Sequence, residues 1–390
     1  MQTVPEKERG VNMLTAAIRE IYKTNLAVKS NERVLVFTDR PTKKDTLSDD
    51  EIRKWSALKD ILMLVEETGR AFCKEILSCI YTSRGGHGKE PPEKLWRLAF
   101  GDGTIAQLNR KGLLKRLINK RISPEMLKEI EEIVRRNRDR AVDAVIALSY
   151  YSTSHTRFRD LLTRVCKARY ASMPLFDVEM FEGPMSVDWK ALQKRTRKIQ
   201  QIVNMATEVS IRTGNGTEIR LSKKGRRARA DSGNLRRPGS FGNLPAGEVF
   251  FAPLEGSARG TMVLEWAPTR KLESRIYLTV KDGLVVSIDG KEPFAGVLKE
   301  KLSERPENAN IAEVGIGTND RASRPDNILE SEKILGTIHI ALGDNSSFGG
   351  RISTPFHQDF VFFHPTVTLH MKDGKRVVLL KAGRLRKDLV

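Results

Sequence analysis

Few cysteines and no long apolar run distinguish this 390-residue sequence. Its three cysteines, Cys73, Cys79 and Cys166, are an odd number without the paired spacing of a zinc site, so we expect reduced thiols rather than a disulfide framework. No stretch reaches the roughly twenty apolar residues that a membrane-spanning helix requires. The first ten residues, MQTVPEKERG, contain no hydrophobic signal core. These absences predict a cytoplasmic protein that has no membrane partner.

Acidic residues are outnumbered by basic ones. The chain has 68 lysines and arginines against 49 aspartates and glutamates, which gives a formal net charge of +19. The densest basic runs are KKGRRARA at 223–230 and RRNRDR at 135–140. Aromatic residues are sparse in both runs, and the second run continues a helical pattern of mixed charge. We interpret the excess as solvated surface charge, and we do not expect nucleic acid as a partner.

The first half of the chain alternates between two kinds of pattern. Apolar runs at 33–38, 75–82 and 144–151 are typical of strands, and amphipathic helical segments separate them. Strands that alternate with helices predict a largely parallel sheet, so an amino-terminal domain of residues 1–207 is expected to be α/β. A helix over 188–209 is predicted to lead into the second half.

From Ser210 onward the pattern changes to strands joined by tight turns. Asp-Gly or Asn-Gly pairs occur in TGNGT, VKDGLV, IDGK and MKDGKR, and each pair predicts a β-hairpin. A carboxyl-terminal domain of residues 208–390 is therefore expected to be mainly antiparallel, with a helix near 293–304. The whole chain is predicted to be α/β in class, with an antiparallel α+β second domain that binds metal.

Four short segments of this second domain place metal-competent side chains in strand-like contexts. They are NLPAGEVF with Glu248, IAEVGIGTN with Glu313, LGTIHIALG with His339, and FHQDF with His357 and Asp359. Side chains alternate between the faces of a strand, so His357 and Asp359 should project the same way. A single strand histidine is more often structural, but several carboxylates and imidazoles together could hold two divalent ions with open positions for water and substrate.

The same segments, in the same order, resemble the aminopeptidase T family of dinuclear metallo-aminopeptidases. The matching strings are NLPAGEVFFAPLEGSARGT, EVGIGTN, LGTIHIALGDN and HQD, and the likeness continues upstream through GKEPPEKLW, STSHTRFR, ARYASMP and GTEIRL. It therefore covers nearly the whole chain. The resemblance implies that the five residues bind two divalent ions (zinc, cobalt or manganese), that one carboxylate, for which Glu313 is the candidate, bridges them, and that the protein is a homodimer.

The resemblance also implies an activity, the hydrolysis of amino-terminal residues from a peptide substrate by a metal-activated water. Glu255, in the loop APLEGSARG, is a candidate for moving a proton or holding the substrate ammonium, and an ordinary surface acid fits it equally well. Arg259 in the same loop could bind a carboxylate or the oxyanion. His155 follows the strand predicted at 144–151, where α/β sheets place ligand contacts, and is a candidate substrate contact.

One departure from the family pattern concerns a tyrosine. The peptidases carry a tyrosine shortly after the HIALG histidine, whereas this chain reads HIALGDNSSFGG, with Ser346 at the equivalent spacing and Phe348 close by. A phenol that could bind metal or stabilise an oxyanion is missing there. Two alternatives therefore stand beside the peptidase: a mononuclear iron ring-cleaving dioxygenase that uses His339, His357 and Asp359 on the same fold, and a non-enzymatic binding protein.

Overall fold

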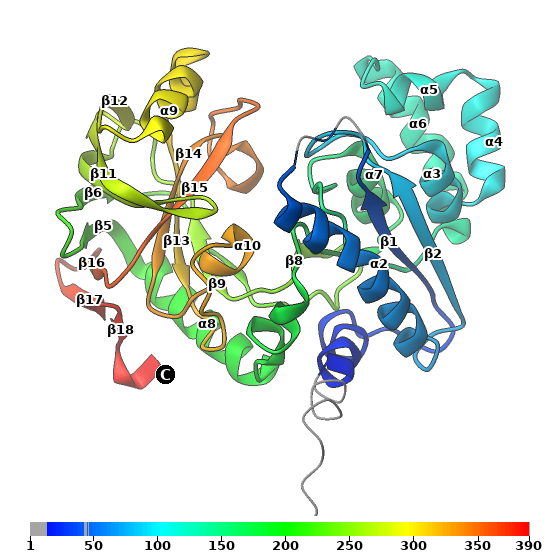
Figure 1. Ribbon diagram of the computed structural model, residues 1–390, viewed down its shortest axis with the longest axis horizontal. Helices are drawn as coiled ribbons and strands as arrows, with labels where there is room; N and C mark the ends of the chain where they lie inside the picture. The colour runs from blue at the N-terminus through cyan, green and yellow to red at the C-terminus, as the bar shows by residue number, and fades with distance from the viewer. Residues whose placement is uncertain (1–13, 43–44, 46, 390) are drawn as a thin grey trace, which may run out of the picture. The chain divides into compact units, whose positions relative to one another are not determined.

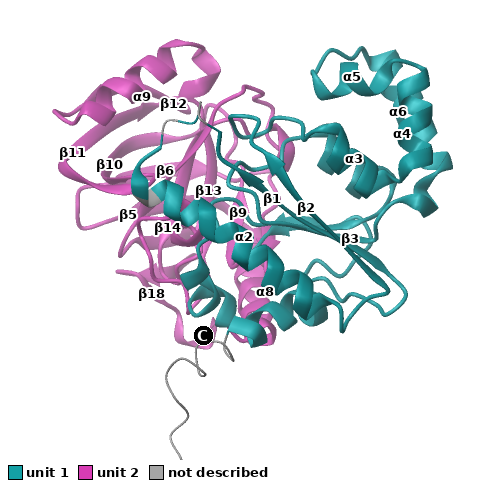
Figure 2. Ribbon diagram, turned by 45° about the vertical axis from the view of Figure 1, so that its right-hand side comes forward, with its two compact units in different colours: residues 1–186, 233–245 teal, residues 187–232, 246–390 magenta. Residues whose placement is uncertain are grey.

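The computed structural model describes residues 14–42, 45 and 47–389, and the chain forms two compact units (Figure 1, Figure 2). The first unit comprises Met1–Ser186 and Gly233–Pro245, and the second comprises Val187–Ser232 and Ala246–Val390. Residue 207, where the sequence places a domain boundary, lies in the second unit, just after helix α8 (Trp189–Met205). Helix α8 therefore belongs to the second unit.

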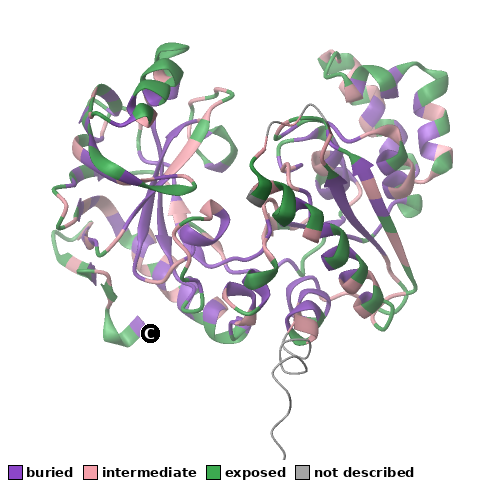
Figure 3. Ribbon diagram, in the orientation of Figure 1, coloured by how far each residue is buried: buried purple, intermediate pink, exposed green. Residues whose placement is uncertain are grey.

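The first unit is built on a five-stranded parallel sheet in the order β2-β1-β3-β4-β8. Its strands are β1 (Arg33–Arg40), β2 (Glu75–Thr82), β3 (Ala144–Ala147), β4 (Arg169–Ser172) and β8 (Phe241–Asn243). The three middle strands, β1, β3 and β4, are almost entirely buried, and Figure 3 draws buried residues in purple. Burial on both faces explains the apolar runs of β1 and β3. The predicted parallel sheet is confirmed.

The helices of the first unit include α2 (Asp49–Gly69), α3 (Glu93–Phe100), α4 (Asp102–Arg110), α5 (Leu113–Ile118), α6 (Pro124–Arg136) and α7 (Arg157–Asp160). Helix α2 begins with a capping box, in which the Ser48 hydroxyl accepts from the backbone N–H of Glu51 and the Glu51 carboxylate accepts from the backbone N–H of Ser48. An apolar cluster joins the sheet to α3–α6 through residues such as Phe37 and Trp96.

The second unit contains two antiparallel sheets. The larger sheet consists of β12 (Leu284–Asp289), β11 (Arg270–Lys281), β10 (Arg259–Ala267), β6 (Glu218–Ser222), β5 (Ala206–Arg212), β16 (Thr366–Met371), β17 (Arg376–Lys381) and β18 (Arg384–Leu385) in that order. The smaller sheet consists of β15 (His357–Phe362), β14 (Ile338–Gly343), β13 (Ile311–Gly317), β9 (Glu248–Phe251) and β7 (Arg229–Asp231). One apolar cluster includes Leu264 and Ile276 of the larger sheet and Ile316 and Ile340 of the smaller, so the core lies between the sheets.

Three of the four predicted hairpins are confirmed. TGNGT joins β5 to β6, VKDGLV joins β11 to β12, and MKDGKR joins β16 to β17. The prediction at IDGK is wrong, because the chain leaves β12 at Asp289 and enters α9 (Pro293–Ser303), whose first position is a proline suited to a helix start. Helix α8 ends at Met205, short of its predicted end, because the next residues pair with β6 and β16 as strand β5.

The chain is thus α/β in class, as predicted, with its parallel sheet in one unit and its antiparallel sheets in the other. A short helix, α10 (Ile328–Ser331), precedes β14 in the second unit. Within the described ranges, none of the helices combines the length and the apolar character needed to cross a lipid bilayer.

Candidate metal centre

The smaller sheet of the second unit has one apolar face and one polar face. Its residues in the core between the sheets include Val249, Phe251, Val314, Ile316, Ile338, Ile340, Leu342, Phe360 and Phe362. Because side chains alternate along a strand, the residues between them project from the opposite face. That face carries the five predicted ligands, Glu248, Glu313, His339, His357 and Asp359, on the four adjacent strands β9, β13, β14 and β15.

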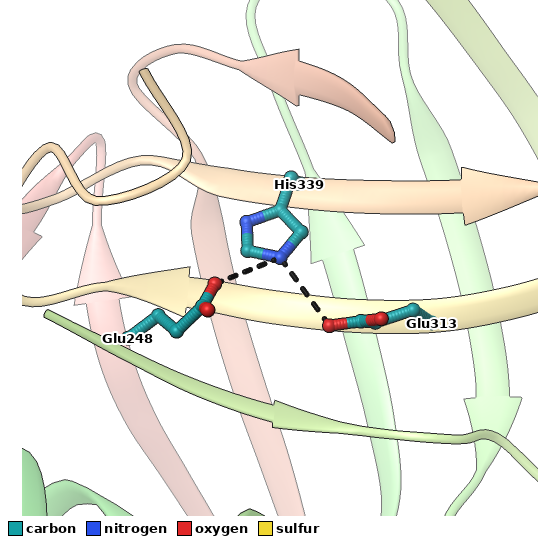
Figure 4. Close-up of side chains that lie close together, drawn as sticks. All are labelled: Glu248, Glu313 and His339. Atoms are coloured by element: carbon teal, nitrogen blue, oxygen red, sulfur yellow. Dashed lines mark ion pairs between the residues drawn. The ribbon is translucent and has the colours of Figure 1, made fainter. Parts of the chain in front are cut away.

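The five side chains meet on this face. Nε2 of His339 lies 3.3 Å from Oε2 of Glu248 and 3.6 Å from Oε1 of Glu313 (Figure 4). Nε2 of His357 lies 3.5 Å from Oε2 of Glu313 and 3.5 Å from Oδ2 of Asp359. The ligand atoms form two groups, each within 4.8 Å, and Glu313 belongs to both. The fold therefore unites residues that are far apart in the sequence.

Two polar atoms of this cluster are buried without a hydrogen-bond partner. Within the described part of the chain, neither Oε2 of Glu248 nor Nδ1 of His339 makes a hydrogen bond. A buried carboxylate oxygen without a donor is costly unless a cation lies close to it. Carboxylate oxygens and imidazole nitrogens are also the ligands that iron, manganese and zinc share. The residues present therefore fit a divalent metal ion.

Gly315 makes room for the ring of His339. The two residues are directly paired across β13 and β14, and a Cβ atom on Gly315 would lie 1.9 Å from Nε2 of His339. Gly317 also allows a close approach, because a Cβ atom added there would lie 2.0 Å from the backbone oxygen of Ile334. The glycines of EVGIGTN thus serve close packing.

Electrostatics in the cluster favour positive charge at the imidazoles. Burial lowers the pKa of His339, but Glu313 and Glu248 outweigh it and raise the pKa to about 9. Burial also lowers the pKa of His357, and Asp359 and Glu313 raise it to about 10. Burial raises the pKa of Glu313 despite its two histidine neighbours. A metal ion bound here competes with these protons for the same atoms.

The residues around His357 fix its orientation. Its Nδ1 lies 2.8 Å from the backbone oxygen of Asp344, and because a carbonyl can only accept, Nδ1 carries the hydrogen and Nε2 is left for a ligand. The ring of Phe348 packs edge-on against His357 with centroids 6.0 Å apart, and Phe250 packs edge-on against Phe348 at 5.7 Å. An apolar aromatic wall therefore stands close to where the peptidases carry a tyrosine.

Glu255 is bound to the loop between β14 and β15. Its carboxylate forms an ion pair with Arg226 and accepts hydrogen bonds from Nδ2 of Asn345 at 3.2 Å and from the backbone N–H of Arg351 at 2.8 Å. The carboxylate thus holds together the loop whose first residue, Asp344, orients His357. Its expected role in moving a proton or holding a substrate ammonium stays a prediction.

The two expected substrate contacts lie outside the five-residue cluster. Arg259 is exposed at the start of β10, where its backbone pairs with Arg220 of β6. His155 belongs to the first unit and follows β3, which ends at Ala147. Neither residue belongs to the two groups of metal-competent atoms found among the described residues. Their contact with substrate stays a prediction.

Lys333 is a residue of the site that the sequence interpretation missed. Its side chain is 1% exposed, and its Nζ donates to Oε1 of Glu248 at 2.8 Å and to Oε2 of Glu332 at 3.0 Å. Burial lowers its pKa, but Glu248 and Glu332 hold the pKa well above the ordinary lysine value. The only signal was a lysine just upstream of His339, which nothing in the sequence linked to Glu248.

Comparison with known proteins places the chain. The model of the NicX family, 2,5-dihydroxypyridine 5,6-dioxygenase, matches residues 184–387, slightly more than half of the chain. The chain belongs to this family. The matched segment contains the five clustered residues and Lys333.

One relative found by sequence and two solved structures are similar to this chain. The chain is 26% identical over 203 residues to the 2,5-dihydroxypyridine 5,6-dioxygenase of Pseudomonas putida, a match that covers 48% of this chain and only 57% of that enzyme. The solved structure of 2,5-dihydroxypyridine dioxygenase from P. putida KT2440 aligns over 97% of this chain and 98% of its own, with a TM-score of 0.66 and 18% identity. AmpT from Thermus thermophilus aligns over 96% and 99%, with a TM-score of 0.56 and 14% identity.

These findings correct the expected function. The resemblance to aminopeptidase T holds for the fold, whereas the family model and the P. putida relative both carry the name of a dioxygenase. The prediction of an enzyme is confirmed at the level of the family, but the prediction of a hydrolase, protease and metallo-aminopeptidase is wrong. The two activities share a fold and draw on the same kinds of ligand, so the ligand residues could not separate them.

Proposed function

We propose that the protein is a metal-dependent dioxygenase that opens a dihydroxylated aromatic ring of the 2,5-dihydroxypyridine kind. The observation that carries this proposal is the family match over residues 184–387, because that segment contains the whole cluster of metal-competent side chains. The proposal extends to the whole chain an activity named for relatives that are matched only in part.

His339, His357 and Asp359 would hold a single iron(II) ion. Two imidazoles and one carboxylate are the ligand set of non-haem iron oxygenases, in which further positions stay open for oxygen and substrate. Nε2 of each histidine faces the carboxylate of Glu313, and Asp359 lies 3.5 Å from His357. When bound, iron(II) supplies the one-electron chemistry that lets dioxygen react with an aromatic ring, which amino-acid side chains do not provide.

The other residues of the site would position these ligands and the substrate. The carboxylate of Glu313 lies 3.6 Å from Nε2 of His339 and 3.5 Å from Nε2 of His357, so it adds negative charge beside both ligands. The backbone oxygen of Asp344 sets which nitrogen of His357 carries the hydrogen. The ring of Phe348 packs edge-on against His357, and Phe250 packs edge-on against Phe348, so this side of the site offers aromatic rings that suit a planar aromatic substrate.

Oxygen uptake tests the proposal. Protein loaded with iron(II) under anaerobic conditions and then mixed with 2,5-dihydroxypyridine in aerated buffer should consume oxygen in step with the loss of the ring's ultraviolet absorbance. Protein loaded with zinc is the matched control, because zinc has no redox chemistry and should consume none. Iron-loaded protein that consumes no oxygen with any dihydroxypyridine or related aromatic diol would reject the proposal.

A further inference from the structure

Lys333 brings a fixed positive charge to the edge of the metal centre. It follows helix α10, its backbone N–H donates to the oxygen of Glu330 at 2.9 Å, and its backbone oxygen accepts from the N–H of Asn319 at 2.8 Å. The side chain is buried, and its Nζ reaches Glu248 at 2.8 Å and Glu332 at 3.0 Å. Both its backbone and its ammonium are therefore held in place.

The two oxygens of Glu248 face different cationic positions. Oε1 accepts from Lys333, whereas Oε2 lies 3.3 Å from Nε2 of His339 and, among the described residues, has no hydrogen-bond partner. A carboxylate arranged in this way keeps only one oxygen for a metal ion. A second divalent ion beside Oε1 would meet the ammonium at contact distance, where like charges in a buried site repel strongly.

We propose that Lys333 is a positioning residue that stands in for a second metal ion, so that this centre takes up one divalent ion, on the side of His339, His357 and Asp359. Its ammonium neutralises Glu248 and aims Oε2 of that carboxylate at His339. This inference rests on the proposed function only in requiring that the centre binds metal. It gives a physical reason why a cluster with enough ligands for two ions would hold one.

Manganese binding tests the role of Lys333 without any turnover. Wild-type protein titrated with Mn²⁺ under anaerobic conditions should bind one ion per chain by calorimetry and elemental analysis, with the electron paramagnetic resonance spectrum of an isolated ion. Lys333→Met, which keeps the side-chain length and removes the charge, should bind a second ion and show a spin-coupled spectrum. Lys333→Arg should keep one ion, and Lys299→Met, the same substitution at an exposed position of α9, should match wild type.

Each outcome bears on the proposal. Two ions on the wild-type chain, or one ion on a folded Lys333→Met variant, would overturn it. If Lys333→Met does not fold, the wild-type ion count and spectrum still decide, because a coupled pair excludes the proposed role. A protein that binds one Mn²⁺ but, loaded with iron, consumes no oxygen would reject the dioxygenase and leave the role of Lys333 standing. A wild-type protein that binds no ion would reject both.

Discussion

Gly315 is the single residue on which the position of the His339 ring depends most directly. Because an added Cβ would lie 1.9 Å from Nε2 of His339, Gly315→Ala forces the imidazole out of its place while it leaves the polar atoms of the cluster intact. We expect metal affinity to fall about 10- to 100-fold, the range seen when groups that orient a ligand are lost. Titration with Mn²⁺, with circular dichroism to check the fold, measures the effect.

Gly296→Ala is the matched control. Gly296 lies within helix α9, and no atom outside its own helix lies within 4 Å of an added Cβ. The substitution should leave metal binding unchanged and stabilise the fold by roughly 0.5–1 kcal/mol, because alanine loses less backbone entropy in a helix. If Gly315→Ala bound metal as tightly as wild type, His339 would not be held in the position seen here.

His357 can be tested against a second strand histidine. His357→Gln removes the imidazole whose Nε2 lies 3.5 Å from both Glu313 and Asp359, so iron binding and oxygen uptake should both be lost. His370→Gln is the control, because Nε2 of His370 instead bonds to the hydroxyl of Ser210 at 2.8 Å on the larger sheet. Elemental analysis measures the iron content of each variant, and an oxygen electrode measures its oxygen uptake. A His357→Gln variant with full iron content would contradict the ligand assignment.

The loop between β14 and β15 is the element that supports His357. Asn345 is fully buried in it, donates to Glu255 at 3.2 Å and accepts from the backbone N–H of Ile352 at 2.9 Å. Gly350 must lack a side chain, since a Cβ there would lie 1.9 Å from the amide group of Asn345. Glu255 therefore contributes through the loop, which carries the backbone oxygen that orients His357.

Glu255→Gln separates this supporting role from a role in proton transfer. Without its charge the ion pair with Arg226 is lost and the loop loosens, so metal affinity should fall by up to about 100-fold while the pH dependence of turnover keeps its shape. If Glu255 moves a proton, the variant should instead bind metal normally and lose one limb of the pH–rate profile. Metal titration and a pH series on the same sample distinguish the two.

At the scale of the whole molecule, metal removal should weaken the smaller sheet of the second unit. An ion that binds only the folded state, present at about 100 times its dissociation constant, stabilises that state by about 2.7 kcal/mol. Chelation should therefore speed hydrogen exchange in β9, β13, β14 and β15. The hairpin of β11 and β12, at the edge of the larger sheet, is the internal reference. Exchange that changes equally in both places would argue against a metal site on the smaller sheet.

The net charge of +19 is a second property of the whole molecule. Two of the five basic side chains in its densest run, KKGRRARA, are engaged within the fold, whereas Lys224, Arg227 and Arg229 are exposed. Lys223 is 2% exposed and donates to the backbone oxygen of Arg226 at 2.7 Å, and Arg226 is paired with Glu255. We expect only weak, salt-sensitive binding to duplex DNA, with a dissociation constant of about 10⁻⁴ to 10⁻⁶ M at physiological salt, measurable by fluorescence anisotropy. Tight, salt-resistant binding would contradict this expectation, and the homodimer stays a prediction for sedimentation analysis.

Local patterns in the sequence were enough to predict many of the structural elements of this protein. Alternation of strands and helices predicted the parallel sheet, Asp-Gly and Asn-Gly pairs predicted three hairpins, and the period of two along a strand placed His357 and Asp359 on one face. The hairpins and the shared face depend on residues within a few positions of one another, where backbone geometry and side-chain direction follow directly from residue type. The five metal-competent residues could be named for the same reason.

What depends on the pairing of distant segments could not be predicted in this way. Helix α8 stops at Met205 because β6 and β16 offer strand partners, and Gly315 stands opposite His339 because β13 and β14 pair in one register. Lys333 meets Glu248 because Glu248 pairs with Gly317 at the end of β13, and Asn319, just after that strand, donates its backbone N–H to the backbone oxygen of Lys333. A buried charge is stable only where folding brings it a partner, and no local pattern records which distant residue that partner is.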